Sequence, residues 1–343
     1  MIGLVAVCVL GFCRCKKGGT HSPPLDTTTT TPKDTPILKG ADVSWLTQME
    51  DSGRLFYDSA GTQMDCMQLL KGLGINLIRL RAWVHPATKY NSTGDVVAKA
   101  VRAHSLGLRV MIDFHYSDTW ADPGHQTKPA TWAGASLAAL GDSVATYTAS
   151  VLDSLKSAGV VPGYVQLGNE TDNGMLWPDG EADSSMANYA ALVNSAYNAV
   201  KAVSDTIKVI VHLSNGYDST HFQWLFDGLK ANGASWDVIG MSLYPSATDW
   251  QTYNQECLAN MNALVTRYNK PVMVCEVGMP ENQAGTCEEF ITDLIHKVRA
   301  VNGGEGLGVL YWEPECYNNW QGYGLGAFDA TGKPTVAMDA FLN

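Results

Sequence analysis

The segment that decides the fold runs from Asn76 to His115 and reads NLIRLRAWVHPATKYNSTGDVVAKAVRAHSLGLRVMIDFH. Its two ends, residues 76–80 and 109–114, are short apolar runs typical of buried strands. Residues 95–107 between them have the apolar spacing of an amphipathic helix that stops at a glycine. A strand, a helix and a second strand in this order predict a unit in which the two strands pair in parallel.

The same alternation of apolar runs and helical patterns continues along most of the chain. The predicted strands are residues 40–43, 76–80, 109–114, 164–167, 209–213, 238–243, 272–275 and 308–311. Eight such units over roughly 300 residues match the α/β class and predict a single (β/α)8 TIM barrel. We expect this barrel to span residues 37–343, without a second domain.

The N-terminal residues differ in composition from the predicted barrel. Residues 1–15 are apolar over too short a run to span a bilayer and predict a signal or lipoprotein segment. The tripeptide LGF before Cys13 resembles a lipoprotein box, with Cys15 a weaker lipid acceptor and a plain cleaved signal as the alternative. Residues 16–36 are rich in Thr and Pro and predict an extended tether. The sequence therefore predicts an exported protein, either a bacterial cell-surface lipoprotein or a secreted one.

The overall charge bears on the class of ligand. Lys and Arg total 23 against 34 Asp and Glu, which gives a net charge of −11 without a basic stripe that would neutralise a phosphate backbone. Nucleic acid is therefore disfavoured as a partner. The 33 Gly and 10 Trp suggest loops with aromatic platforms, which favour neutral sugars over charged metabolites.

Polar side chains follow each predicted strand at the point where it ends. In barrel enzymes the reacting groups lie at these carboxyl ends. Strand ends are also polar simply because water begins there, but that explanation does not account for so many reactive residue types on different strands. These residues are Asp42 and Ser44, Arg79 and Arg81, Asp113 and His115, Asn169 and Glu170, His212 and Ser214, Ser242 and Tyr244, Glu276, and Trp312 and Glu313.

Two of these carboxylates predict a glycosidase. Glu170 closes the fourth strand and Glu276 the seventh, so they lie roughly across the barrel mouth from each other. Glycoside cleavage needs one carboxylic acid to protonate the leaving oxygen and one carboxylate to attack or to activate water. A buried ion pair and a metal site are the alternatives, but the available histidines, His115, His125 and His212, lack the HxH spacing of a metal hydrolase.

Long Glu side chains directed inward from these two strands can approach to about 5–5.5 Å, the separation used by retaining enzymes. The sequence therefore predicts a retaining double displacement. Because an enzyme needs both carboxylates and a carbohydrate-binding module does not, their joint presence favours catalysis over the alternative of a non-catalytic surface glycan-binding barrel.

Several motifs carry a specific resemblance. The GNE of residues 168–170, together with Glu276, resembles the clan A retaining glycosidases, and HYSDTWADPGHQTKPATW at 115–132 resembles glycoside hydrolase family 53. The blocks IRLRAWVHP (78–86), GNETDNGMLWPDG (168–180), SLYP (242–245) and YWEP (311–314) fall where that family has similar blocks. The resemblance covers residues 40–343 and implies an arabinogalactan endo-β-1,4-galactanase that hydrolyses galactan and type I arabinogalactan. We also expect the chain to be a monomer.

The resemblance also implies roles for individual residues. Glu170 is expected to be the acid and base and Glu276 the nucleophile, with Asn169 on the sugar 2-hydroxyl. His115 and Tyr244 are expected to line the subsite of the bond being cleaved, and Trp312 to form its floor. The further predicted substrate-binding residues are Asp42, Arg79, Arg81, Trp83, Asp118, Trp120, Trp177, His212 and Trp320, with Trp132 either in this set or a core anchor.

The two arginines need a separate prediction. Arg79 and Arg81 point to the same side of their strand, so either can hold Glu276 as a carboxylate, while the deeper one can instead form a structural ion pair. We expect no cofactor. Calcium is doubtful because the loop VGMPENQAGTC (277–287) is short, has Val277 directly after the nucleophile and lacks an Asp-rich calcium spacing.

The cysteines suggest little metal chemistry. Cys275 lies within an apolar run and is expected to be a buried free thiol. Cys287 and Cys316 fall in neighbouring loops that are bridged in fungal members of the family, so both a disulfide between them and two free thiols are open.

Overall fold

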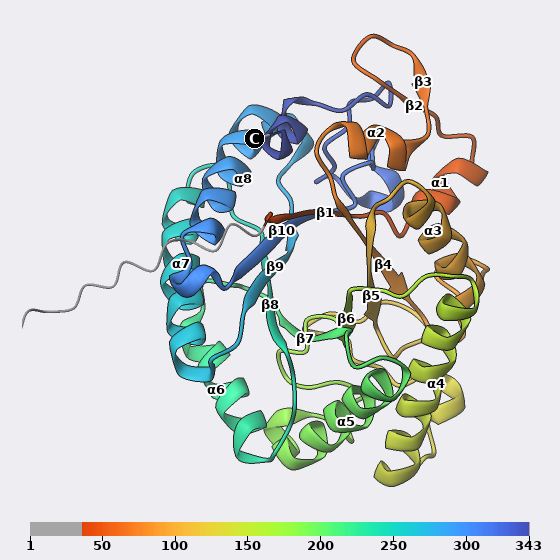
Figure 1. Ribbon diagram of the computed structural model, residues 1–343, viewed down its shortest axis with the longest axis vertical. Helices are drawn as coiled ribbons and strands as arrows, with labels where there is room; N and C mark the ends of the chain where they lie inside the picture. The colour runs from red at the N-terminus through yellow and green to blue at the C-terminus, as the bar shows by residue number, and fades with distance from the viewer. Residues whose placement is uncertain (1–35, 343) are drawn as a thin grey trace, which may run out of the picture. The chain divides into compact units, whose positions relative to one another are not determined.

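Eight parallel strands close into a barrel in the computed structural model, which describes residues 36–342 (Figure 1). The hydrogen-bonded order is β1-β10-β9-β8-β7-β6-β5-β4, and β1 also pairs with β4. The barrel strands are β1 (Leu38–Asp42), β4 (Leu77–Ala82), β5 (Arg109–Phe114), β6 (Tyr164–Leu167), β7 (Lys208–Leu213), β8 (Val238–Leu243), β9 (Val272–Val277) and β10 (Gly306–Trp312). The predicted (β/α)8 barrel is confirmed, with every predicted strand boundary within two residues of the observed one. The predicted signal segment and the tether up to residue 35 lie outside the described residues.

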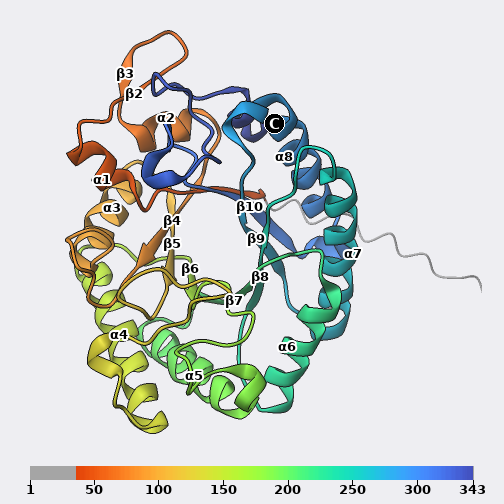
Figure 2. The same cartoon turned by 180° about the vertical axis from the view of Figure 1, so that it is seen from behind.

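Helices surround this barrel as an outer ring, which is visible from both sides (Figures 1 and 2). The helices are α1 (Leu46–Asp51), α2 (Cys66–Gly72), α3 (Thr93–Ser105), α4 (Leu137–Ser157), α5 (Ala182–Val203), α6 (Ser219–Ala231), α7 (Trp250–Tyr268) and α8 (Ala284–Arg299). Short 3-10 segments cover Ala130–Trp132, Glu281–Gln283, Asn302–Gly304, Trp320–Gly322 and Val336–Phe341. None of the described helices is both long and apolar enough to cross a membrane.

Side-chain caps explain where several helices begin. Asp65, Ser92, Ser136 and Asp218 each accept a hydrogen bond from the backbone N–H three residues later, at the starts of α2, α3, α4 and α6. Such a cap satisfies one of the free N–H groups of a first helical turn and stabilises the helix by about 1 kcal/mol. These four helices therefore have a fixed start at the end of the loop that precedes each of them.

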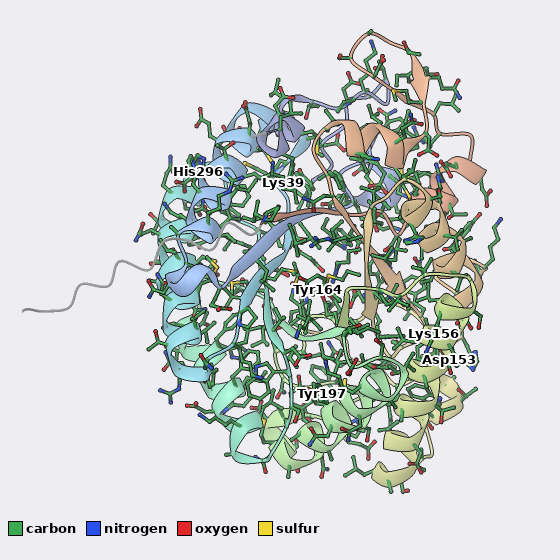
Figure 3. The ribbon with its side chains drawn as sticks, viewed as in Figure 1. Lys39, Asp153, Lys156, Tyr164, Tyr197 and His296 are labelled. Atoms are coloured by element: carbon green, nitrogen blue, oxygen red, sulfur yellow. The ribbon has the colours of Figure 1, made fainter. Side chains whose placement is uncertain are left out.

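The core has two layers. The larger layer lies between strands and helices, and a smaller cluster fills the barrel interior with Leu38, Leu77, Met111, Ile210, Val238, Met273, Cys275 and Leu310. Tyr164, labelled in Figure 3, packs against this inner cluster. A Cβ at Gly240 would lie 2.9 Å from the Cys275 Sγ, so only glycine fits there. The barrel is therefore filled, and ligands have access only at its mouth.

One feature of the fold, a hairpin, was not expected from the sequence, and another, the state of the cysteines, decides between two expectations. A short antiparallel hairpin, β2 (Phe56–Tyr57) and β3 (Gln63–Met64), lies between β1 and α2 and was not predicted. All five cysteines of the described residues are buried free thiols, as expected for Cys275. The disulfide between Cys287 and Cys316 is absent because the two sulfurs face different neighbours, the Tyr311 hydroxyl at 3.7 Å and the Met49 sulfur at 3.8 Å.

Candidate active site

Several strands end in a residue with left-handed backbone. Tyr116, Glu170, Asn215 and Glu313 have φ of 51°, 43°, 49° and 50° and follow β5, β6, β7 and β10. This conformation is uncommon for residues other than glycine and costs of order 1 kcal/mol or more. Glu170 itself lies three residues after β6, where its backbone N–H donates to the His212 Nδ1 at 3.3 Å and its carbonyl accepts from the Gln126 Nε2 at 3.3 Å, so neighbouring segments help to position it.

Glu276 lies in β9 and is 5% exposed. Its carboxylate forms an ion pair with the Arg79 Nη2 at 2.8 Å and accepts a hydrogen bond from the Tyr244 hydroxyl at 2.9 Å. The structure thus decides which arginine holds the predicted nucleophile. Charge-assisted bonds of this kind favour the ionised form of the carboxyl.

The same guanidinium organises several acidic groups. Arg79 also contacts Asp42 at 2.7 Å and Asp113 at 3.0 Å, and all of these side chains are buried. Asp42 was predicted to bind substrate, but the structure places it fully buried beneath Arg79, with its second oxygen bonded to the Ser44 N–H at 2.9 Å. Asp42 therefore supports the arginine from below.

The two carboxyl groups have different proton affinities. Burial, reinforced by the negative charge of Glu276, raises the pKa of Glu170 to about 8, although a hydrogen bond with Ser242 lowers it. Burial raises the pKa of Glu276 to about 7, against the lowering effects of Arg79 and Tyr244. A pair with one proton therefore carries it on Glu170, and Glu276 is the carboxylate.

Gln166 is a residue of the site that sequence reasoning missed. Its Nε2 donates to the Asp113 Oδ1 at 2.7 Å, and its Oε1 accepts from the Arg79 Nη2 at 3.1 Å. The same Arg79 nitrogen contacts the Asn169 Oδ1 at 3.0 Å. Gln166 interrupts the otherwise apolar strand YVQL, and its inward position follows from the two-residue alternation of strands. A single polar residue within an otherwise apolar predicted strand was therefore the feature that could have identified Gln166.

Both predicted histidines are buried behind the mouth. The His115 Nε2 contacts the Asp113 Oδ2 at 3.0 Å, and its Nδ1 accepts from the Ala121 N–H at 2.9 Å. The His212 Nε2 contacts the Ser242 hydroxyl at 2.9 Å. Burial lowers the pKa of each imidazole, so both are neutral at pH 7 and position neighbouring groups.

An aromatic wall lies beside the carboxyl pair, and we use this name for Trp45, Trp120, Trp312 and Tyr323. The Trp45 ring centroid is 5.3 Å from those of Trp120 and Trp312, and that of Trp312 is 4.8 Å from Tyr323. The wall lines a cavity of about 500 Å³, which also includes the predicted Trp83. Trp45 and Tyr323 were not predicted, because each lies in a loop whose path the sequence does not reveal.

Arg81 supports this wall from the strand that also carries Arg79. Its guanidinium lies 4.0 Å from the centre of the Trp120 ring and 3.2 Å from the Glu313 carboxylate. Glu313 in turn accepts the Trp45 N–H at 3.0 Å. Arg79, the deeper of the two arginines, thus holds the predicted nucleophile in addition to its structural ion pairs with two aspartates. Arg81 forms a separate structural ion pair with Glu313.

Four other predicted residues lie outside the arrangement around Glu170 and Glu276. Both oxygens of Asp118 accept backbone N–H groups, from His85 and Ala130, at 2.9 Å. The Trp177 indole N–H donates to the Asn173 carbonyl at 2.8 Å. Trp132 is 8% exposed and belongs to the core, and Trp320 lies under the Arg54 guanidinium at 5.6 Å.

The described residues contain one group of His, Cys, Asp or Glu side chains close enough to share a metal ion, namely Glu313, Glu315 and Cys316. All three are buried. The group includes none of the three histidines weighed as metal ligands in the sequence.

The mouth combines one proton-bearing carboxyl group, Glu170, with one carboxylate held by a cation, Glu276, and an aromatic surface. Together these groups suit glycoside cleavage.

Comparison with known proteins agrees with this chemistry. A family model described as glycosyl hydrolase family 53 matches residues 38–341. The arabinogalactan endo-β-1,4-galactanase of Cellvibrio japonicus is 34% identical over 352 residues, covering 90% of this chain and 90% of that protein. The endo-β-1,4-galactanase of Bacillus subtilis is 33% identical over 308 residues, covering 81% of this chain and 70% of that protein.

Solved structures give the same relationship in three dimensions. A structure from a study of two fungal β-1,4-galactanases superposes with a TM-score of 0.83 at 29% identity, covering 90% of this chain and all of that one. The family 53 catalytic domain of Ignisphaera aggregans superposes with a TM-score of 0.81 at 28% identity, covering 90% and 97% of the two chains. Fold, length and sequence therefore agree over the whole barrel.

Proposed function

The chain belongs to glycosyl hydrolase family 53 and is an endo-β-1,4-galactanase, and from this premise we propose that it cleaves galactan by a retaining double displacement. The observation that carries the mechanism is the division of labour between two carboxyl groups. Glu276 is held as an anion by Arg79 and Tyr244, and Glu170 has the higher pKa.

In the first step the Glu276 carboxylate attacks the anomeric carbon of a galactosyl residue. The bond from that carbon to the glycosidic oxygen breaks, and Glu170 gives its proton to this oxygen, so the leaving sugar departs as an alcohol. The product is a galactosyl ester on Glu276 and a Glu170 carboxylate. Proton transfer at this point avoids an unstable alkoxide leaving group.

In the second step Glu170 acts as the base. It takes a proton from a water molecule, the water oxygen attacks the anomeric carbon, and the ester bond to Glu276 breaks. Both carboxyl groups return to their starting protonation states, and the product has the β-configuration of the substrate. Asn169 is expected to hydrogen-bond the 2-hydroxyl as positive charge develops at the anomeric carbon.

The aromatic wall supports internal cleavage of a polymer. Its cavity of about 500 Å³ is lined by four Trp residues of the described chain, Trp45, Trp83, Trp120 and Trp312. Aromatic rings pack on the apolar faces of sugars, so several adjacent rings bind successive residues of a chain. Trp312 is expected to be the floor for the residue that is cleaved.

The location of the enzyme is a further part of the proposal. The apolar residues 1–15, the tripeptide before Cys13 and the Thr/Pro-rich tether support an exported protein that is lipid-anchored on a bacterial surface. Mass spectrometry of the mature chain from its own cells is expected to show lipid on Cys13. An unmodified chain in the medium would instead support plain secretion.

The experiment for the activity uses the purified full chain and linear β-1,4-galactan. New reducing ends are expected, and proton NMR of the fresh hydrolysate is expected to show the β-anomer before mutarotation. An initial α-anomer would contradict retention. Binding of galactan without any new reducing ends would instead favour the alternative of a glycan-binding barrel.

A further inference from the structure

A second cavity lies at the barrel mouth, outside the site described above. Its volume is about 520 Å³, within the range of small-molecule sites. Asp172, Asn173 and Asp183 line it from the segment between β6 and the start of α5. On the other side, Asp218, His221 and Trp224 line it from the beginning of α6.

This cavity and the aromatic wall lie on opposite sides of the mouth. The wall comes mainly from the loops after β1, β5 and β10, whereas the second cavity comes from those after β6 and β7. In the barrel order, β6 and β7 face β10 and β1 across the barrel. A chain lying over the mouth therefore passes from one cavity to the other, with the carboxyl pair between them.

Asp172 links the second cavity to the acid. Asp172 is two residues after Glu170 in the same segment, and its negative charge contributes to the raised pKa of Glu170. Both the N–H and the hydroxyl of Ser214 donate to Asp172, at 3.0 and 2.7 Å, which fixes this segment to the end of β7. Because Glu170 protonates the leaving oxygen, the side of the mouth that carries Glu170 faces the leaving part of the substrate.

Trp224 gives this cavity a platform. Its side chain is 40% exposed, which is unusual for so large an apolar group, and the His221 ring packs beside it with centroids 5.3 Å apart. An indole held in this way offers a face to the apolar side of a sugar ring. The exposed carboxylates Asp183 and Asp218 offer acceptors for hydroxyl groups. The Asn173 amide is bonded within the protein, its Oδ1 accepting the Asp183 N–H at 2.8 Å and its Nδ2 donating to Glu181 at 3.4 Å.

The charges in the cavity restrict the class of ligand. Among the described residues that line it, three are aspartates and none is Lys or Arg. Such a surface repels phosphates and uronates, and it accepts hydrogen bonds from neutral polyols. A neutral sugar is therefore the ligand class that fits.

We propose that this second cavity, with Trp224 as its platform, is a subsite that binds neutral sugar residues in the leaving part of the galactan chain. The inference rests on the proposed function and deepens it. It assigns the side of the mouth beyond Glu170 to the leaving part of the galactan chain. It also adds Trp224 as a residue that contacts substrate without taking part in the chemistry.

The test compares Trp224→Ala with the full-length parent chain on two substrates. On linear galactan, kcat/KM is expected to fall about five- to tenfold, the effect of losing one aromatic contact. On an aryl β-galactoside, whose leaving group ends before the second cavity, kcat/KM is expected to stay within about twofold. Transfer of galactosyl groups to added galactotriose is expected to fall together with the galactan activity.

Two matched variants control for folding. Trp224→Phe keeps a ring and is expected to recover most of the galactan activity. Val161→Ala removes another exposed apolar side chain, 52% exposed, from the loop before β6 at the opposite end of the barrel, and is expected to leave both substrates unaffected. Equal losses of Trp224→Ala on both substrates, or no loss on galactan, would overturn the subsite. A parent chain that cleaves neither substrate would overturn the proposed function, and the subsite with it.

Discussion

Strand β4 carries two buried arginines that serve two different pairs of carboxyl groups. Arg79 holds Glu276, which faces the mouth, at 2.8 Å. Arg81, two residues later, holds Glu313 at 3.2 Å beneath the aromatic wall. The first pair is completed by Glu170, in the loop after β6, and the second by Glu315, two residues along the same loop as Glu313.

Both pairs have raised pKa values, for the same physical reason. Burial raises the pKa of Glu170 to about 8 and that of Glu313 to about 7, and burial beside Glu313 raises the pKa of Glu315 well above its usual range. The difference is access, because Glu170 is partly exposed whereas Glu313 and Glu315 are fully buried. A perturbed carboxyl pair therefore indicates catalysis only where one of its members is open to solvent.

The largest expected effects are losses of activity, and they are confined to the pair at the mouth, Glu170 and Glu276. Glu170→Gln removes the acid and is expected to lower kcat on galactan about 10²–10⁴-fold, and Glu276→Gln removes the nucleophile and is expected to abolish turnover. Azide is expected to rescue Glu170→Ala on an activated aryl galactoside. A good leaving group needs no acid in the first step, and the azide anion can attack the galactosyl ester without the missing base in the second. Steady-state kinetics give both results. High residual rates in either Gln variant would contradict the assignment.

The two arginines are expected to differ in their effect on stability. Arg79→Ala leaves Asp42, Asp113 and Glu276 buried without their cation, and we expect a loss of about 3–5 kcal/mol in the free energy of unfolding. Arg81→Ala is expected to cost less, because Glu313 already has a raised pKa and can take up a proton. Urea denaturation at pH 7 compares the two variants. Equal losses in the free energy of unfolding would show that the two groups of carboxylates depend equally on their arginines.

The pH dependence of kcat/KM sharpens the assignment of the mouth pair. Activity needs Glu276 ionised and Glu170 protonated, so it is expected to rise through about pH 7 and fall through about pH 8. On an aryl galactoside with a good leaving group, Glu170→Gln is expected to lose the descending limb and keep the ascending one. A descending limb that persists in this variant would assign it to another group.

The smallest effect is expected at Glu315. Its pKa is raised, so the folded chain keeps it neutral while the unfolded chain ionises above about pH 4.3, and its favourable contribution to stability is lost as the pH rises from there. Glu315→Gln removes this dependence. Its unfolding temperature, relative to the parent chain, is therefore expected to increase from pH 5 to pH 8, with galactanase activity within about twofold. A large loss of activity would give this pair a role in the reaction.

The barrel and the mouth pair could be predicted because they depend on periodicity and on strand ends. Eight alternating units fix the parallel order, and the order fixes which strand ends meet, so Glu170 and Glu276 are brought to the same mouth. The role of each arginine was not predictable. Arg79 and Arg81 face the same way, and their depth in the barrel depends on the strand register that only the coordinates supply.

Features made by loops escaped the sequence for a related reason. The hairpin of β2 and β3 has two residues per strand, too few to show a period. Trp45 and Tyr323 reach the aromatic wall, and Asp118 turns inward to its own loop, through contacts that no local pattern encodes. Whether Cys287 and Cys316 form a disulfide or remain free thiols depends in the same way on the conformation of their loops.

The left-handed residues at the strand ends have a consequence for how such an enzyme diversifies. Glu170, with φ of 43°, lies at the head of the segment between β6 and α5, three residues after the strand. The remainder of that segment, residues 174–181, follows the reacting group along the chain. We therefore expect grafts confined to residues 174–181 to change which polymer is recognised more than they change the bond-breaking step, which would let an engineer vary the first while keeping the second.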